Sequence, residues 1–266
     1  MSRKVVVSVI MGVYNQKNEE LLKRSIQSIL SQSEKSIEFI ICDDGSNIEN
    51  KTLLRNLASQ DERIIFIENQ HNMGLSYTLN RCIDLANGEF IARMDDDDIS
   101  DKKRLEFEVD FLRKNKEFSF VGCSAYLIDD KGEIWSERIT ITEPRKEDFL
   151  KGSQFIHPSV LFRANVLKEN KYSCKSWCER TEDYDLWMRL YAKGNRGYNL
   201  KEKLFYYRED LDGMKKRKMK YRINEMIVRY HGFKSLNIIL VGIPFLIKPI
   251  LVGMLPNRII KFLHKR

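Results

Sequence analysis

The chain has 266 residues, of which 42% are hydrophobic and 11% are aromatic. This composition excludes a wholly disordered protein, and the length suffices for one large α/β domain or for a catalytic domain with a short appendage. The formal net charge of +8 is unevenly spread: residues 214–266 hold 13 Lys and Arg against one acidic residue, a net of +12, which leaves −4 on residues 1–213. A mildly acidic body with a strongly basic tail predicts an anionic surface as the partner of the tail.

The cysteines indicate the compartment. The chain has five, an odd number at irregular spacing, and its basic N-terminus leads directly into an apolar run from Val5 that predicts a strand and not a cleavable signal. We therefore expect reduced thiols in a cytosolic compartment. Cys174 and Cys178 with His157 are also a weak candidate for zinc ligands, although one pair and a distant histidine fit ordinary thiols better.

The first half of the chain alternates apolar, β-branched runs with amphipathic segments. Strands are expected at residues 5–14, 37–42, 63–68 and 89–94, and helices at residues 19–32, 53–58, 74–86 and 101–114. This alternation predicts an α/β fold with a mostly parallel central sheet and helices on both of its faces. Ligands of such sheets bind beyond the carboxyl ends of the strands, where the strand order reverses.

The second half is less regular. Its pattern predicts a β-hairpin at residues 118–128 and 133–141, a strand at 157–162, a helix at 182–193 and a last short strand at 204–208. After residue 213 the composition becomes basic and then strongly apolar, which predicts a helical tail.

Two acidic clusters follow predicted strands of the first half. Asp43 and Asp44 end the second strand, and four consecutive aspartates, Asp95 to Asp98, end the fourth. Adjacent carboxylates repel one another unless a cation binds, and oxygen ligands of this kind suit Mg²⁺ or Mn²⁺ bridging to a diphosphate. Taken singly, the first cluster also fits an ordinary turn and the second a solvated loop before a helix.

Five motifs occur in one fixed order, and together they carry a resemblance. They are Val9–Asn15, Asp43-Asp44-Gly45-Ser46, Asn72-x-Gly74, Ala92-Arg93-Met94-Asp95-x-Asp97-Asp98 and Thr181-Glu182-Asp183-Tyr184-Asp185-Leu186-Trp187. The sequence over residues 4–210 resembles the family-2 glycosyltransferases of the GT-A fold. These are inverting, metal-dependent enzymes of polysaccharide and lipopolysaccharide synthesis. The resemblance implies sugar transfer from a nucleotide-diphosphate sugar, with UDP favoured, to a glycan or lipid-linked acceptor.

The resemblance also implies roles for particular residues. The base and ribose of the donor would be held by the first strand end and by one acid of the first cluster: Val13, Tyr14, Asn15, and Asp43 or Asp44. The rest of the donor site would comprise Asn72, Gly74, Arg93, Asp95 and Asp96. Asp97 would contact Mn²⁺ or Mg²⁺ directly, and Asp95 would meet the ribose or reach the metal through water. Asp183 would be the catalytic base.

Other positions are assigned less narrowly. His157, Glu182 and Glu209 are candidates for contact with the acceptor or the metal. Two departures from the family pattern stand out. Many relatives have an arginine in the helix after Asn-x-Gly, where this chain has Leu79 and Asn80, so Arg93 or Arg81 would have to meet the phosphates. Many relatives also have a histidine after Tyr-Arg, where Glu209 and Asp210 stand here.

We expect three regions: a nucleotide-sugar-binding half at 1–115, an acceptor-binding half at 116–213, and a tail at 214–266. The apolar part of the tail is near spanning length but is interrupted by Pro244, Lys248 and Pro249. Interfacial attachment to an anionic membrane is the favoured interpretation, which makes the protein peripheral at the inner face of the cell membrane. Packing on the body or on a partner subunit in a homodimer, and a true span, are the alternatives. Nucleic acid is not expected as a partner.

Three other functions compete with sugar transfer. A sugar-phosphate nucleotidyltransferase would also use metal and nucleotide, but it would show a glycine-rich, basic loop after the first strand, which Met11–Asn15 is not. A glycoside hydrolase with two carboxylates would need no nucleotide. A non-catalytic module would use the acidic loops to hold calcium.

Overall fold

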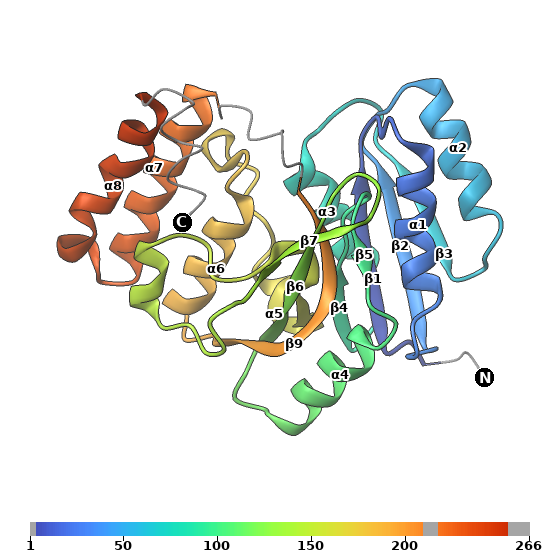
Figure 1. Ribbon diagram of the computed structural model, residues 1–266, viewed down its shortest axis with the longest axis horizontal. Coiled ribbons are helices and arrows are strands. Elements are labelled where there is room, and N and C mark those ends of the chain that lie inside the picture. Colours follow the sequence, from blue (N-terminus) through green and yellow to red (C-terminus); the bar gives the residue numbers. More distant parts are fainter. Residues whose placement is uncertain (1–3, 210–217, 255–266) are drawn as a thin grey trace.

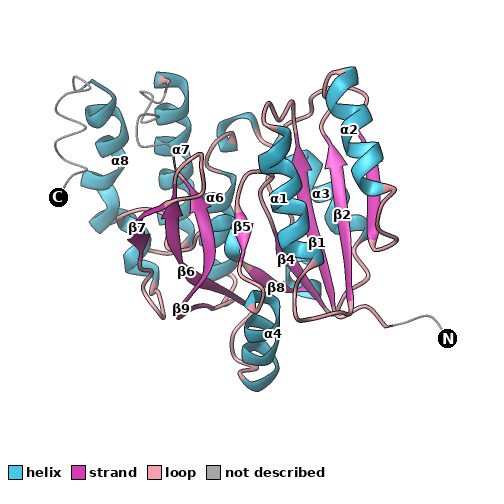
Figure 2. Cartoon of the chain, turned by 45° about the vertical axis from the view of Figure 1, so that its right-hand side comes forward, coloured by secondary structure: helices cyan, strands magenta, loops and turns pink. Residues whose placement is uncertain are grey.

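The computed structural model describes residues 4–209 and 218–254, and it has the α/β fold that the sequence predicts (Figures 1 and 2). Nine strands form one sheet in the order β3-β2-β1-β4-β8-β6-β9-β5, with β7 paired to β6. Helices α1, α2 and α4 pack on one face of the sheet and α3, α5 and α6 on the other. The described chain thus has three layers, with two further helices beside α6.

The first half of the sheet is parallel. Its elements are β1 Val7–Val13, α1 Glu19–Leu30, β2 Ile37–Asp43, α2 Ile48–Ala58, β3 Ile64–Glu68, α3 Leu75–Leu85 and β4 Phe90–Arg93. β1 lies between β2 and β4, and β3 lies outside β2. The chain moves outward from β1 to β3 and then returns to pair β4 with the other side of β1. The reversal of strand order therefore falls between β1 and β4.

The second half mixes both orientations. Its elements are β5 Ile99–Ser100, α4 Arg104–Lys114, β6 Phe120–Ile128, β7 Ile134–Arg138, β8 Leu161–Arg163, α5 Ala164–Glu169, α6 Glu182–Ala192 and β9 Gly197–Arg208. β8 is antiparallel to β4 and β6, β7 is antiparallel to β6, and β5 is antiparallel to β9, whereas β9 is parallel to β6. The predicted hairpin of β6 and β7 is confirmed.

Three details differ from the sequence-based expectations. The strand expected at 157–162 begins only at Leu161, because His157–Ser159 forms a single 3-10 turn with proline as its second residue. The last strand, β9, already begins at Gly197, and most of its length pairs with β6. The pattern also gave no signal for the short elements β5 and α5, which hold too few residues for a clear periodicity.

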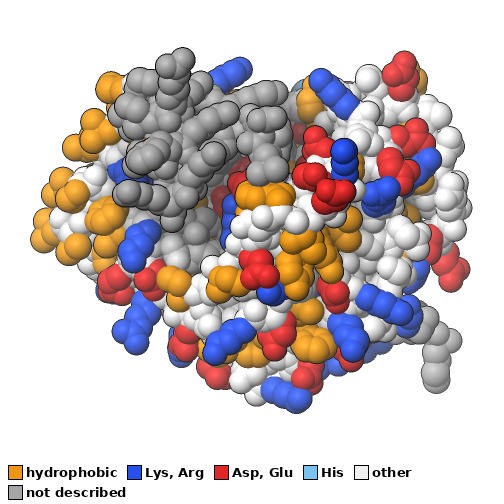
Figure 3. Space-filling model, viewed as in Figure 1, with side chains coloured by type: hydrophobic (Ala, Val, Ile, Leu, Met, Phe, Trp, Pro, Cys, Tyr) orange, Lys and Arg blue, Asp and Glu red, His pale blue; other side chains and the backbone are white. Residues whose placement is uncertain are grey.

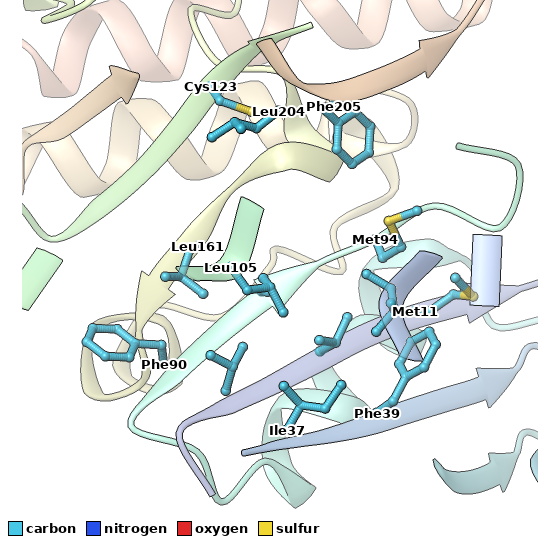
Figure 4. Close-up of a cluster of buried hydrophobic side chains, with 14 of the residues drawn as sticks. Met11, Ile37, Phe39, Phe90, Met94, Leu105, Cys123, Leu161, Leu204 and Phe205 are labelled. Carbon is cyan, nitrogen blue, oxygen red and sulfur yellow. The ribbon is translucent and has the colours of Figure 1, made fainter. Parts of the chain in front are cut away.

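The core explains why these elements form. Side chains of β1, β2, β4, β8 and α4 meet between the sheet and the helices, among them Met11, Phe39, Phe90, Leu105 and Leu161, all fully buried (Figure 4). Each such side chain contributes about 1.5–3 kcal/mol relative to an exposed one. A second cluster on the opposite face is centred on Trp187 of α6. Both clusters include side chains of β1, β2 and β4. Their packing therefore fixes where the carboxyl ends of these strands lie.

The tail forms two helices that lie against each other, α7 Met219–Ser235 and α8 Ile239–Met254. α7 packs on α6, and its Arg229, 3% exposed, donates a 2.8 Å hydrogen bond to the carbonyl of Leu150. α8 contacts α7 at Gly242, whose missing side chain leaves room for the ring of Phe233. None of the helices described here is both long and apolar enough to cross a membrane.

Candidate active site

The acidic clusters lie at the carboxyl ends of β1, β2 and β4, as expected. Val13 and Asp43 are register partners at the ends of β1 and β2. On the other side of β1, Ile10 pairs with Arg93 at the end of β4, so the run from Asp95 follows this edge directly. The reversal of strand order between β1 and β4 thus brings both clusters to one side of the sheet, where α/β sheets bind their ligands.

Two adjoining cavities open at this edge. The smaller, of about 330 Å³, lies between β1 and the start of α3 and is lined by Gly12, Val13, Tyr14, Asp44, Asn72, Gly74, Leu75, Thr78, Glu179, Arg180 and Glu182. The larger, of about 550 Å³, lies over β4 and the start of α6 and includes Arg93, Asp95, Arg138, Ser153, His157, Asp183 and Tyr207. The two share Leu75, Arg180 and Glu182 and therefore lie side by side, and together they are called the groove below.

Asp44 shapes the smaller cavity. Its Oδ1 accepts hydrogen bonds from the amide of Met73 at 2.8 Å and from the side chain of Asn69 at 2.7 Å, and its Oδ2 accepts from the amide of Gly74 at 2.9 Å. Gly74 has φ of +84°, a conformation that side chains disfavour. The carboxylate therefore fixes the Asn72–Gly74 loop as one wall of the cavity.

Two of the residues assigned to the base and ribose face elsewhere. The carboxylate of Asp43 is fully buried and accepts from the amide of Ser46 with both oxygens, and it is not among the residues that line the cavity. Asn15, with φ of +48°, donates its amide to the Ser46 hydroxyl and accepts from the amide of Asn47. Both residues hold the turn before α2, while Val13, Tyr14 and Asp44 line the cavity.

Arg93 joins the acidic run to the larger cavity. Its side chain is 2% exposed and forms an ion pair with Asp95. Burial is the largest single influence and opposes ionisation, but the charge of Asp95 and the hydrogen bond to it, together with the charges of Tyr172 and Asp98, raise the pKa of Arg93 above its ordinary value. Arg93 is among the residues that line this cavity, and its buried Nε atom has no hydrogen-bond partner among the described residues.

The remaining aspartates of the run have raised pKa values. Burial, with the charges of Asp97 and Asp95, raises the pKa of Asp96 to about 7, and burial with Asp95 raises that of Asp97 to about 6. Asp98 is buried and its pKa is also raised by burial; its Oδ1 accepts from the amide of Arg208 at 2.7 Å, and its Oδ2 has no described partner. Asp96 and Asp97 are not among the residues that line either cavity.

Asp183 lies in the first turn of α6 and lines the larger cavity. Its Oδ2 accepts a 3.1 Å hydrogen bond from the hydroxyl of Ser153, and that hydroxyl accepts a 3.1 Å bond from the indole of Trp187. Trp187 is fully buried, so the chain of two hydrogen bonds ties the carboxylate to the core. Beside it, burial raises the pKa of Glu182, whose Oε2 has no described partner.

The other candidates are held by identifiable partners. His157 is 2.7 Å from the hydroxyl of Tyr172, and burial followed by the charge of Arg93 lowers its pKa well below the usual range, so the ring is neutral. Glu209 is ion-paired with Arg138 at 3.1 Å. The guanidinium of Arg81 donates to the carbonyl of Glu68 and to Asn69, which turns it toward the end of β3. Asp210 lies outside the described residues.

The structure adds residues that sequence reasoning did not select. Ser153, Tyr172 and Arg138 contact predicted site residues, and Arg180 lies where the two cavities meet. Arg180 directly precedes the Thr-Glu-Asp motif, and this position is the feature of the sequence that could have identified it as a site residue. The other three belong to segments without a motif and reach the site only through the pairing of β6 with its neighbours and the loops around β8.

The fold and the groove together are those of an α/β protein with a ligand-binding site at the carboxyl edge of its sheet, where the strand order reverses. A model of glycosyl transferase family 2 matches residues 8–170 of the chain. A Bacillus subtilis protein named as a glycosyltransferase, EpsE, is 37% identical over 98% of this chain and 93% of its own length. The chain therefore belongs to glycosyltransferase family 2 and is a transferase, which confirms the resemblance drawn from the motifs.

A further relative and two solved structures are similar to the chain. The Escherichia coli UDP-Glc:alpha-D-GlcNAc-diphosphoundecaprenol beta-1,3-glucosyltransferase WfaP is 27% identical over 88% of this chain and 87% of its own length. The S. aureus protein TarS in complex with UDP-GlcNAc matches with a TM-score of 0.66 at 15% identity, over 88% of this chain and 72% of that one. The mannosyltransferase PcManGT of Pyrobaculum calidifontis with GDP-Man and Mn²⁺ matches with a TM-score of 0.63 at 15% identity, over 95% and 76%. These structures share the GT-A fold.

The family match also decides between the competing functions. A nucleotidyltransferase, a glycoside hydrolase and a calcium-binding module were the alternatives to sugar transfer. Membership of glycosyltransferase family 2 sets all three aside.

Proposed function

We propose that this glycosyltransferase moves a sugar from a UDP-sugar to a hydroxyl group of a glycan or lipid-linked acceptor, with inversion at the transferred carbon, in the synthesis of a cell-surface polysaccharide or lipopolysaccharide. The observation that carries the proposal is the groove, in which a cavity at the β1–α3 edge adjoins a second cavity lined by Asp183. Complexes of TarS with UDP-GlcNAc and the donor and acceptor in the name of WfaP support this choice.

The smaller cavity is the proposed nucleotide site. Val13, Tyr14 and Asp44 line it, and the Asn72–Gly74 loop closes one side. A uracil ring presents a donor N–H, and a carboxylate such as that of Asp44 accepts it. Asp43 and Asn15 would contribute indirectly, because their hydrogen bonds to Ser46 hold the turn that carries Asp44.

The larger cavity is the proposed acceptor site, with Asp183 as the base. The acceptor hydroxyl attacks C1 of the donor sugar, its proton passes to the Asp183 carboxylate, a C–O bond forms to the acceptor, and the bond from C1 to the diphosphate oxygen breaks. Ser153 and Trp187 orient the carboxylate for this task. His157 and Glu182 line the cavity, and Glu209, through its ion pair with Arg138, supports the rim.

Mn²⁺ or Mg²⁺ is the proposed cofactor, held by Asp97 and Asp95. Over residues 4–209 and 218–254 no group of three His, Cys, Asp or Glu side chains could hold a metal by itself. The cation would therefore be shared with the donor diphosphate and water, which is common for Mg²⁺. The raised pKa values of Asp96 and Asp97 and the unpartnered Oδ2 of Asp98 indicate excess negative charge that a cation would relieve. When bound, the metal neutralises charge on the leaving diphosphate.

We assign the donor to residues 1–115, the acceptor to 116–213 and membrane contact to 214–266, on a protein peripheral to the inner face of the membrane. The described part of the tail supports this with an exposed apolar stripe on α8, where Leu240, Ile247 and Leu251 are 81%, 51% and 58% exposed. Apolar side chains accordingly gather along the α8 edge of the molecule (Figure 3). Lys220 and Lys248 add positive charge. The basic residues at 215–217 and 258–266 lie outside the described residues.

The proposal is tested by the melting temperature of the full chain with UDP, GDP and free Mn²⁺. A ligand that binds only the folded state stabilises it, by about 2.7 kcal/mol at a concentration of 100 Kd. We expect UDP with Mn²⁺ to raise the melting temperature more than either alone, and more than GDP with Mn²⁺. The same stabilisation by UDP in EDTA would contradict the metal assignment, and a larger effect of GDP would contradict the UDP assignment.

A further inference from the structure

Arg180 places a positive charge at the junction of the two cavities of the groove. It lines both of them, together with Leu75 and Glu182. Among the residues described as lining the smaller cavity, Arg180 is the only Lys or Arg, whereas Asp44, Glu179 and Glu182 are acidic. A nucleoside diphosphate in this cavity would therefore meet a single cationic side chain of the described chain, and it would meet it at the junction.

Three other arginines near the groove lie outside the smaller cavity. Arg93 is buried at the floor of the larger cavity and paired with Asp95. Arg81, the other substitute that the sequence suggests for a phosphate contact, donates to the carbonyl of Glu68 and to Asn69 at 2.6 Å each. Arg138 is paired with Glu209 and stacks 4.9 Å from the ring centre of Tyr207. None of the three lines the smaller cavity.

The chemistry places the diphosphate at this junction. The bond that breaks joins C1 of the sugar to the diphosphate, and the attacking hydroxyl approaches C1 from the acceptor side. If the nucleoside occupies the smaller cavity and Asp183 receives the proton in the larger one, the diphosphate must lie between them. Negative charge grows on the diphosphate as the bond breaks, and fixed donors at that point stabilise the transition state. A guanidinium supplies two parallel N–H groups to phosphate oxygens.

The backbone holds Arg180 in this place. Its φ of +67° lies in the left-handed region, which costs a non-glycine residue about 1–2 kcal/mol. The turn is anchored on both sides: Thr181 donates its amide to the carbonyl of Cys178 at 2.9 Å, and Glu179 pairs with Lys220 of α7 at 2.6 Å. Arg180 itself is exposed. The fold thus maintains an unfavourable backbone conformation at the residue whose cationic side chain lines both cavities.

We propose that Arg180 binds the diphosphate of the donor and stabilises it as the leaving group. This inference rests on the proposed function and adds to it a residue for the diphosphate. Lys220 and α7 become indirect contributors, because they hold the turn through Glu179. Because Arg180 would contact the diphosphate directly, its replacement should weaken the binding of ligands that carry phosphates. It should leave the binding of the nucleoside alone unchanged.

The test compares UDP with uridine. Calorimetric titration of the full chain in Mn²⁺ gives both dissociation constants for the wild type, Arg180→Lys and Arg180→Gly; the glycine variant removes the side chain without retaining backbone strain. We expect Arg180→Gly to weaken UDP binding at least tenfold and to change uridine binding less than twofold. The UDP affinity of Arg180→Lys should lie between those of the wild type and Arg180→Gly, because an ammonium group keeps the charge but cannot donate two parallel N–H groups to a phosphate.

Arg113→Ala is the matched control, because Arg113 is a half-exposed arginine paired with Glu89 at the opposite edge of the sheet. It should bind both ligands as the wild type does. If Arg180→Gly binds UDP as the wild type does, or if it loses affinity equally for UDP and for uridine, the inference is wrong. The proposed function would not be affected by either result. If the wild type binds no nucleoside diphosphate in Mn²⁺, the proposed function fails first and the inference falls with it.

Discussion

Single side chains determine the chemistry proposed for the groove, and Asp183 is the residue with the largest expected effect. Asp183→Asn keeps the shape of the side chain but cannot accept a proton at neutral pH. We expect kcat to fall by about 10²–10⁴, the usual contribution of a general base. The Kd for UDP in Mn²⁺ should stay within about twofold of the wild type, because Asp183 lines only the larger cavity.

The control for this variant lies two residues further along α6. Asp185 is paired with Arg189 at 2.7 Å and lines neither cavity, so Asp185→Asn should retain most of the wild-type kcat. Steady-state kinetics of the two variants with the same donor separate the roles. An Asp183→Asn enzyme with more than a tenth of wild-type kcat would show that another group is the base.

A second prediction at the residue scale concerns Glu108, which is fully buried beneath the site. Neither carboxylate oxygen has a hydrogen-bond partner among the described residues, and burial raises its pKa from 4.5 to about 8, while Arg104 acts in the opposite direction. Because the folded-state pKa is above the unfolded one, the contribution of Glu108 to stability is greatest below about pH 4.5 and is lost as the pH rises through about 8.

Glu108→Gln removes this dependence, since the amide resembles the protonated acid. The melting temperature of the variant should exceed that of the wild type at pH 8, and the two should converge near pH 5. Thermal unfolding of both proteins across this range without divalent cation makes the comparison. A difference of the same size at both pH values would mean that Glu108 is ionised in the folded state.

At the scale of elements, α7 and α8 have different tasks although both belong to the tail. α7 completes the core beside α6: Val228 and Phe233 are buried, and Arg229 is bonded to the Leu150 carbonyl. α8 instead covers α7 with one side and presents the apolar stripe of Leu240, Ile247 and Leu251 with the other. Removing the whole tail would therefore damage the body, so membrane binding is better tested with substitutions on α8.

The prediction compares two variants of the full chain in co-sedimentation with vesicles. Replacing Leu240, Ile247 and Leu251 by serine should abolish most of the binding to vesicles of anionic lipid, because it removes the buried apolar area. The control is Ile48→Ser, which changes a 70% exposed isoleucine on α2 and should bind as the wild type does.

A salt series separates the two contributions to membrane binding. Salt screens the basic residues but not the apolar stripe, so high salt should release the wild type only in part. If the wild type stays in the supernatant with anionic vesicles at low salt, α8 is not a membrane-binding element.

At the scale of the whole molecule, the groove arises because two halves of different topology meet along one sheet. The parallel half provides the strand ends that carry Asp44 and Asp95, and the mixed half provides Ser153, His157 and Asp183 through loops and α6. Arg104 of α4 crosses this boundary. Its buried guanidinium donates to the carbonyl of Arg93 at 3.3 Å and to that of Pro158 at 3.1 Å, so it holds the two halves in register.

The parallel half of the sheet and the family were both predicted correctly from the sequence alone. Continuous apolar strands, amphipathic helices and acidic strand ends are local patterns, and their order predicted the fold. The roles of Asp44, Asp95 and Asp183 are implied by the resemblance of the motifs to the family, and they stay predictions. Local patterns also predicted the β6–β7 hairpin. They were sufficient because each depends on residues close together in the chain.

Only the tertiary structure decided which side chains share a cavity. Asp43 and Asn15 belong to predicted motifs but form hydrogen bonds within the turn before α2, and Glu209 is ion-paired with Arg138 of β7. Arg180, whose backbone is left-handed, lines both cavities. α7 belongs to the core because Gly232 lies against Met188 of α6 and Phe233 against Gly242 of α8. These outcomes depend on contacts between distant segments, whose free energies are set by packing and burial and leave no periodic mark in the sequence.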